Sequence, residues 1–248
     1  MANPLHQFVI EPLTQGPVIP GTEIAFTNQS LWMVSVTILV GLFMAFGMRK
    51  KALVPGRLQG FIEITYDMID GLVKDIAGKQ AKGLIPVVFT LFVFIASLNV
   101  AGMIPTSYTA TSQIITTGVM AISVFLAVII MGVWKHGLKF FGLFAPSGVP
   151  LFLMPVLIPL EIVSFFIRPF THAVRLAANM MAGHIALKVF ATFIVGFMAM
   201  EGVAVLGAAL PFAGLFALTV LELVVALLQA YIFTLLTCVY LNDAINLH

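Results

Sequence analysis

Residues 167–184 read IRPFTHAVRLAANMMAGH, and this stretch decides how the whole chain must fold. It lies inside a long apolar region, residues 151–200, yet it carries two arginines, two histidines and an asparagine. An arginine at the centre of a bilayer costs about 2.5–3.5 kcal/mol on insertion scales, and such residues usually face a protein interior or water. We therefore interpret the helix around Arg175 as a functional element that needs a partner.

Composition places the chain in a membrane. Hydrophobic residues make up 61% of the 248 residues and charged residues 9%, whereas a soluble globular chain averages about 25% charged residues. The mean hydropathy is +1.12. No polar segment is long enough to form a soluble domain, so we expect one all-α, polytopic membrane domain over residues 1–248.

The same composition argues against several other classes of function. A net charge of +2 does not point to nucleic acid. The single cysteine, Cys238, lies in an apolar run, so an internal disulfide and a thiol metal site are not expected. No residue pattern predicts a metal or another cofactor, and none predicts a hydrolase site.

Apolar runs long enough to cross a bilayer, about 20 residues, predict five membrane-embedded helices. They cover residues 31–48, 84–104, 118–134, 151–200 and 203–245. The last two runs exceed one span, so we expect them to form a long, tilted or kinked antiparallel hairpin. Residues 56–78 have apolar side chains at helical spacing, interrupted by acidic ones. This pattern fits an amphipathic helix on the cytoplasmic surface, and equally a helix packed on a partner.

Basic residues set the expected orientation. They cluster between residues 49 and 82 and again between 135 and 139, whereas residues 1–30 contain no lysine or arginine. By the positive-inside rule, the N-terminal segment 1–30 is external and the C-terminus is cytoplasmic. We expect a multi-pass membrane protein in this orientation, and the family resemblance given below implies the bacterial inner (plasma) membrane.

A helical wheel gathers polar residues on one side of the first hairpin helix. At 100° per residue, Arg168 falls about 20° from Arg175, and Glu161 and Asn179 fall about 40° away on the same side. Thr171 falls about 40° away on the other side. Glu161 and Arg175 are about 21 Å apart along the axis, too far for an ion pair, so they are interpreted as stations along a path. Arg168 is interpreted as a helix-end anchor.

The hairpin also predicts which residues face one another across the two helices. With the apex near residues 201–202, Arg175 lies level with Gln229, and His184 lies within about one turn of Glu222. His184 and Glu222 would form an acid–imidazole pair on the external side of Arg175. A lone buried histidine or glutamate is more often structural than a proton carrier, and that alternative stays open. Arg175 has no acidic residue within one turn, so its counter-charge is expected on another chain.

One known family shares these residues. The chain resembles subunit a of the membrane sector of the rotary F-type ATP synthase, on the basis of Arg175-Leu176-x-x-Asn179-Met180-x-x-Gly183, Glu222 and Leu227-x-Gln229-Ala230-Tyr231-x-Phe233. Histidine on the first hairpin helix and glutamate on the second resemble the mitochondrial members, which indicates an alphaproteobacterial or mitochondrion-like source.

The resemblance implies a function and a set of roles. Arg175 would face a rotating ring of c subunits, with Asn179 and Gln229 as its neighbours. Glu222 and His184 would line an external half-channel. Glu161 would line a cytoplasmic half-channel, with Ser164 and Thr171 as further candidates.

The resemblance also implies partners and leaves one rival reading. The partners would be the c-subunit ring, the b-type peripheral stalk subunits, the lipid bilayer and the rest of the ATP synthase, with no chemistry on ATP in this chain. The alternative is a secondary ion transporter with a midplane arginine site, although such proteins usually contain internal repeats, and none is evident. A haem subunit is disfavoured because His172 and His184 point about 120° apart on the wheel.

Overall fold

The structure is a computed structural model that describes residues 10–13, 25–49, 52, 54–104, 107–144, 152–200 and 202–246. Most of segment 1–30, the hairpin apex at Glu201 and residues 247–248 lie outside these ranges. Within them the chain is helical, with one isolated β-bridge between Pro12 and Thr27. The prediction of an all-α, polytopic membrane protein is confirmed.

Five of the described helices are long and apolar enough to cross a membrane. They are α1 (Asn28–Gly47), α3 (Ile85–Gly102), α4 (Ile114–His136), α5 (Met154–Met198) and α6 (Ala209–Ile245). Short 3₁₀ helices flank them: η2 (Lys79–Leu84), η3 (Ala110–Ser112), η4 (Gly137–Phe144) and η5 (Gly202–Ala208). Helix α4 begins four residues before the predicted span, and in this first turn the buried Thr117 hydroxyl donates to the backbone carbonyls of Ile114 and Gln113.

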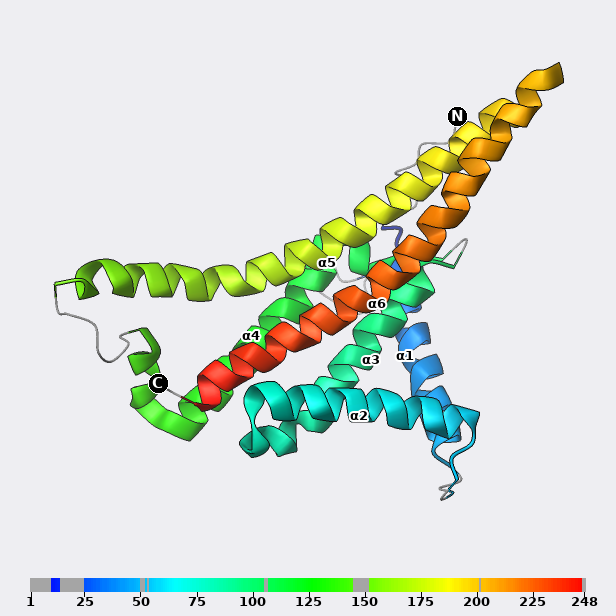
Figure 1. Ribbon diagram of the computed structural model, residues 1–248. Helices are drawn as coiled ribbons and strands as arrows, with labels where there is room; N and C mark the ends of the chain where they lie inside the picture. Colours follow the sequence, from blue (N-terminus) through cyan, green and yellow to red (C-terminus); the bar gives the residue numbers. More distant parts are fainter. Residues whose placement is uncertain are drawn as a thin grey trace.

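Helix α2 (Arg57–Ala77) is the predicted amphipathic helix, and it packs inside this chain. Its buried face contains Ile62, Ile69, Val73 and Ala77, spaced by four or seven residues. This face contacts α3 and α6, and Figure 1 shows α2 lying across the ends of the α1 and α3 helices. One face of α2 is therefore buried within this chain, whereas Leu58, Phe61 and Ile64 are exposed, so both readings of the amphipathic pattern stay open.

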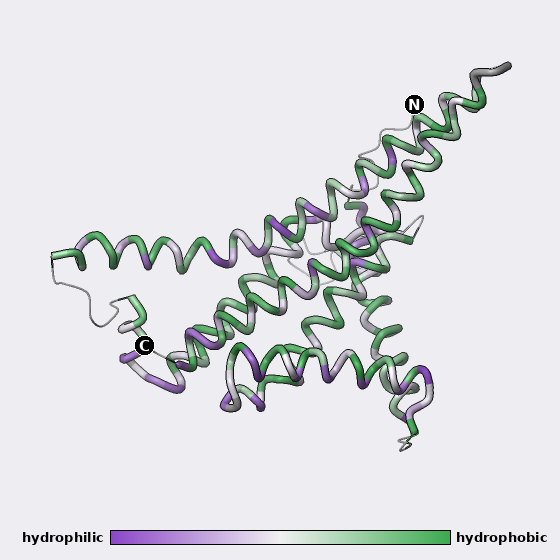
Figure 2. Tube along the Cα trace, viewed as in Figure 1, coloured by the Kyte–Doolittle hydropathy of each residue, from purple (hydrophilic) through white to green (hydrophobic). Residues whose placement is uncertain are grey.

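Helices α5 and α6 form a long antiparallel hairpin whose far end extends beyond the other helices (Figure 1). Helix α5 changes direction along its length in the same view. Pro159 and Pro169 lie inside α5, where each lacks the N–H that would bond the carbonyl four residues earlier. Figure 2 shows that polar positions interrupt the apolar surface of both hairpin helices.

The core lies where the hairpin crosses α3 and α4. The largest buried side chains there include Ile95, Leu176 and Met180, packed near the small residues Ala226 and Ala230. Small residues let helices in a membrane approach closely. Helix α3 is also fastened to α6 by Asn99, which is fully buried and donates through Nδ2 to the carbonyl of Ala226 at 2.9 Å.

Candidate functional site

One side of the middle of α5 is exposed, and Arg175 lies on it. The exposed positions follow one another at three- and four-residue spacing: Thr171, Arg175, Ala178, Asn179 and Ala182. We call these five residues the arginine stripe. The opposite side of the same turns is buried against the rest of the chain. The stripe is therefore an outward-facing surface of the hairpin at the level of Arg175.

The charge of Arg175 has no partner among the described residues. No salt bridge or hydrogen bond joins the Arg175 guanidinium to any residue that the structure describes. Left facing lipid, such a charge would cost about 2.5–3.5 kcal/mol or more. Its neighbours Ala178 and Ala182 have small side chains, which leave room for another helix to approach closely. That the counter-charge of Arg175 lies on another chain stays a prediction.

The predicted acid–imidazole pair, His184 and Glu222, is present, and His184 lies nine residues after Arg175 on α5. His184 Nδ1 lies 2.5 Å from Glu222 Oε1, and the two residues are 7% and 6% exposed. The hairpin register therefore predicted this contact correctly. The other ring nitrogen, Nε2, lies 2.9 Å from the carbonyl oxygen of Gly102 at the end of α3.

The Gly102 carbonyl decides how protons are held on this pair. A carbonyl oxygen only accepts hydrogen bonds, so His184 Nε2 carries a hydrogen and donates it. Nδ1 and Glu222 Oε1 then share one further proton, as a neutral pair or as an ion pair. The arrangement is able to pass a single proton between an imidazole and a carboxyl group within a buried site.

A cavity lies beside Glu222 and is also lined by Asn179 and Ala182 of the arginine stripe. It has a volume of about 320 Å³ and lies between α5 and α6. Its polar lining comes from Glu222, Gln229 and Asn179, with Gly183 beside them and apolar side chains around the remainder. The cavity therefore extends from Glu222 to Asn179, one turn of α5 from Arg175.

Gly183 leaves the space that the Glu222 carboxyl group occupies beside His184. A Cβ atom at Gly183 would lie 2.7 Å from Glu222 Oε1, closer than packed atoms tolerate. We expect Gly183→Ala to push the carboxyl away from His184 at a cost of about 1–3 kcal/mol. Proton flow through the assembled protein in vesicles should then fall about tenfold. The matched control is Gly196→Ala on the same helix, where a Cβ meets nothing within 4 Å. Equal flow in the two variants would contradict the prediction.

An acid–arginine–acid group lies on the other side of Arg175, toward the N-terminal part of α5. Arg168 Nη1 donates to Asp243 Oδ2 at 2.8 Å, and Arg168 Nη2 lies 3.8 Å from Glu161 Oε1. Arg168 is inside α5 and ion-paired with both acids, so its interpretation as a helix-end anchor is wrong. Glu161 pairs with Arg168, and no ion pair joins it to Arg175 within the described residues.

The sequence reading did not find Asp243. The hairpin register places Arg168 level with residue 236, about two turns from Asp243. Arginine side chains lean toward the N-terminus of their helix, and adding that lean to the register would have brought Asp243 within reach.

Of the remaining candidate residues, some are exposed on α5 and one is buried. Ser164 and Thr171 are exposed on α5, and the Thr171 hydroxyl donates to the Arg168 carbonyl. His172 is buried and stacked on Phe233, with ring centroids 4.6 Å apart. It therefore shares no pocket with His184, which weakens the haem reading further.

Comparison with known proteins gives the family. The family model described as "ATP synthase A chain" matches residues 30–242. The chain belongs to this family. Its curated relatives include proteins named ATP synthase subunit a from Parvibaculum lavamentivorans, 50% identical over 98% of this chain and 94% of that protein, and from Nitrobacter hamburgensis, 48% identical over 99% of both. A relative from Rhodopseudomonas palustris is 47% identical over 99% of both chains.

These relatives confirm the resemblance to subunit a and the alphaproteobacterial character that the His184 and Glu222 positions indicated. The part of the chain that matches the ATP synthase A chain family contains every predicted site residue. Asp243 follows the last matched residue directly.

Proposed function

We propose that this chain is the proton-translocating stator subunit of an ATP synthase, with Arg175 facing a rotating ring of c subunits. One observation carries the proposal: an exposed, unpaired arginine lies between a buried acid–imidazole pair and a second acid on the same helix. The peripheral stalk subunits of the b type and the lipid bilayer complete its surroundings.

In this mechanism Arg175 acts on the carboxyl group of each passing ring subunit. At 4 Å and an effective dielectric of 20, the attraction is about 4 kcal/mol in favour of the ionised carboxylate. A ring carboxyl that reaches Arg175 therefore gives up its proton. A membrane potential of 100 mV adds about 2.3 kcal/mol for each charge that crosses.

The two half-channels supply and remove that proton. Glu222 and His184 load the ring carboxyl from the external side, through the cavity that Asn179 and Gln229 also line. Glu161 receives the released proton on the cytoplasmic side, with Ser164 and Thr171 nearby on α5. Arg175 lies between the two paths, and its fixed positive charge repels a proton that would cross directly.

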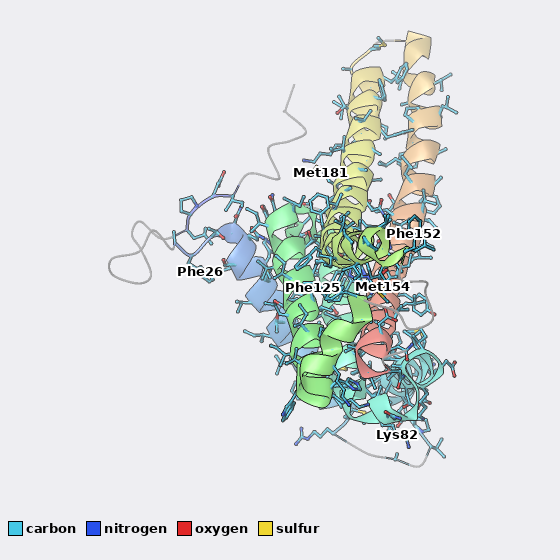
Figure 3. The ribbon with its side chains drawn as sticks, turned by 90° about the vertical axis from the view of Figure 1, so that its left-hand side faces the viewer. Phe26, Lys82, Phe125, Phe152, Met154 and Met181 are labelled. Atoms are coloured by element: carbon cyan, nitrogen blue, oxygen red, sulfur yellow. The ribbon has the colours of Figure 1, made fainter. Side chains whose placement is uncertain are left out.

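The distribution of basic residues supports the proposed orientation, with the N-terminus external and the C-terminus cytoplasmic in a bacterial inner membrane. Figure 3 shows Lys82 at the end of the molecule opposite the tip of the α5–α6 hairpin. Lys135 at the end of α4 bonds Gln80 of η2, so basic residues from two connections gather at this end. By the positive-inside rule this end faces the cytoplasm.

Cysteine cross-linking tests the rotor contact. In a Cys238→Ala background, Ala178→Cys and Asn179→Cys should each cross-link rapidly to cysteines placed beside the ring carboxylate, because both positions lie on the arginine stripe. Leu176→Cys is the matched control, since Leu176 is 1% exposed on the opposite side of the same turn. If neither stripe position reaches the ring while both proteins are assembled, Arg175 has no rotor partner and the secondary-transporter reading returns.

A further inference from the structure

Asp243 is the charged group of the site that neither the sequence motif nor the matched family region contains. We propose that Asp243 is a positioning residue, which keeps Arg168 beyond hydrogen-bond distance of Glu161 and so weakens the ion pair that would otherwise hold the Glu161 carboxylate. The inference rests on the proposed function, because it assumes that the cytoplasmic path runs through Glu161.

The distances rank the two acids as partners of Arg168. The contact with Asp243 is a direct hydrogen bond at 2.8 Å, whereas the contact with Glu161 is 1.0 Å longer, at 3.8 Å. The guanidinium also lies over the Tyr240 ring at 5.1 Å and near the Phe165 ring at 5.8 Å. Tyr240 and Asp243 are both in the last turns of α6. Tyr240 and Asp243 at the end of α6 thus form a binding site for the Arg168 guanidinium, and this site competes with Glu161.

The helix geometry allows Arg168 to change partner. Glu161 lies seven residues before Arg168 on α5, about 10.5 Å along the axis. The long arginine side chain already reaches back over most of this length, so a small rotation at its tip closes the remaining gap. The side chains of Arg168, Glu161 and Asp243 are 23%, 31% and 28% exposed, so none of them is locked in the core.

Other charged groups near this end have their own contacts or lie farther away. On α4, Lys135 donates to Gln80 and His136 lies 2.9 Å from the carbonyl of Ile245. Lys139 of η4 is exposed, and Arg175 is two turns beyond Arg168 on α5. Within the described residues, Glu161 and Asp243 are the only carboxylates that pair with Arg168.

This arrangement makes a specific prediction about two single variants. In Asp243→Asn, Arg168 loses its nearer acid and moves onto Glu161, which strengthens their ion pair. In Arg168→Gln, the positive charge beside Glu161 disappears. The midpoint of proton pumping against cytoplasmic pH should therefore move down in the first variant and up in the second, each by about one unit, or tenfold in proton affinity.

The double variant tests whether Asp243 acts through Arg168 or whether the two charges act independently on Glu161. If Asp243 acts through Arg168, removing the Asp243 carboxylate from a protein that already carries the Arg168→Gln substitution changes nothing further. The Arg168→Gln, Asp243→Asn profile should then coincide with that of Arg168→Gln alone. If the two charges act independently on Glu161, the shifts add and the double variant lies between the singles. Additive shifts would overturn the proposal.

The experiment measures ATP-driven proton pumping in inverted membrane vesicles that contain the whole complex, as a function of external pH and normalised to assembled protein. Asp70→Asn is the matched control: Asp70 pairs with Lys74 on α2, so the variant removes an ion-paired aspartate elsewhere and should leave the midpoint unchanged. Asp243→Glu should keep the original profile. Failure of Asp243→Asn to assemble, or a lower rate with an unmoved midpoint, would make Asp243 structural and overturn the inference.

Glu161→Gln in the same vesicles tests the proposed function separately. Pumping that continues unchanged at every pH would remove Glu161 from the path and contradict the proposed function. Pumping that stops in Glu161→Gln, combined with midpoints that do not move oppositely in Asp243→Asn and Arg168→Gln, would leave the proposed function intact and refute only the role of Asp243.

Discussion

Arg175→Lys is expected to abolish coupled proton transport while the complex still assembles. Guanidinium stays protonated when it is dehydrated and can bind a carboxylate through two hydrogen bonds, whereas a buried lysine can lose its proton. Losing about 4 kcal/mol of attraction corresponds to about three orders of magnitude in the equilibrium that ionises the ring carboxyl. ATP synthesis driven by an imposed proton gradient in vesicles is the measurement.

The control for this variant is Arg57→Lys, the same substitution at an exposed position at the start of α2. It should leave synthesis unchanged. Retained ATP-driven pumping by the Arg175→Lys protein would remove the main argument for the arginine stripe as the rotor-facing surface.

Glu222→Gln should slow proton flow by about two orders of magnitude, the usual contribution of one acid–base group. The amide has the shape of the carboxyl and can still bond His184 Nδ1, so we expect the buried contact to survive. It cannot give up a proton, and the shared proton of the pair no longer moves. Proton flow and the amount of assembled complex should be measured together, with Glu11→Gln at an exposed site as the control.

A different outcome would change the assignment of Glu222. If Glu222→Gln leaves no assembled complex, Glu222 is a structural residue that joins α6 to His184. If flow and assembly both match the control, the external half-channel does not pass through this pair.

Much of the fold could be predicted because bilayer thickness fixes the length of an apolar span. The apex near residues 201–202 gave the antiparallel register of the hairpin, and the register in turn predicted the contact between His184 and Glu222. The start of α4 was missed because a hydropathy pattern counts Thr117 as polar, although its hydroxyl is satisfied by carbonyls of its own helix.

The candidate site was harder to predict where a contact depends on the length and direction of a long side chain. A wheel places Arg168 beside Arg175, but it cannot show that the Arg168 side chain extends toward the end of α6 and meets Asp243. It also cannot show which side of α5 the neighbouring helices cover. That Arg175 is exposed and Leu176 buried depends on how α3, α4 and α6 pack against α5.

The Gly102 carbonyl favours histidine over glutamate at position 184. An imidazole at position 184 can donate to this oxygen, whereas a carboxylate there would set two acceptors against each other in a buried place. An unpaired buried acceptor costs about 1–3 kcal/mol. Exchange of His184 and Glu222 is therefore not a neutral step for this chain.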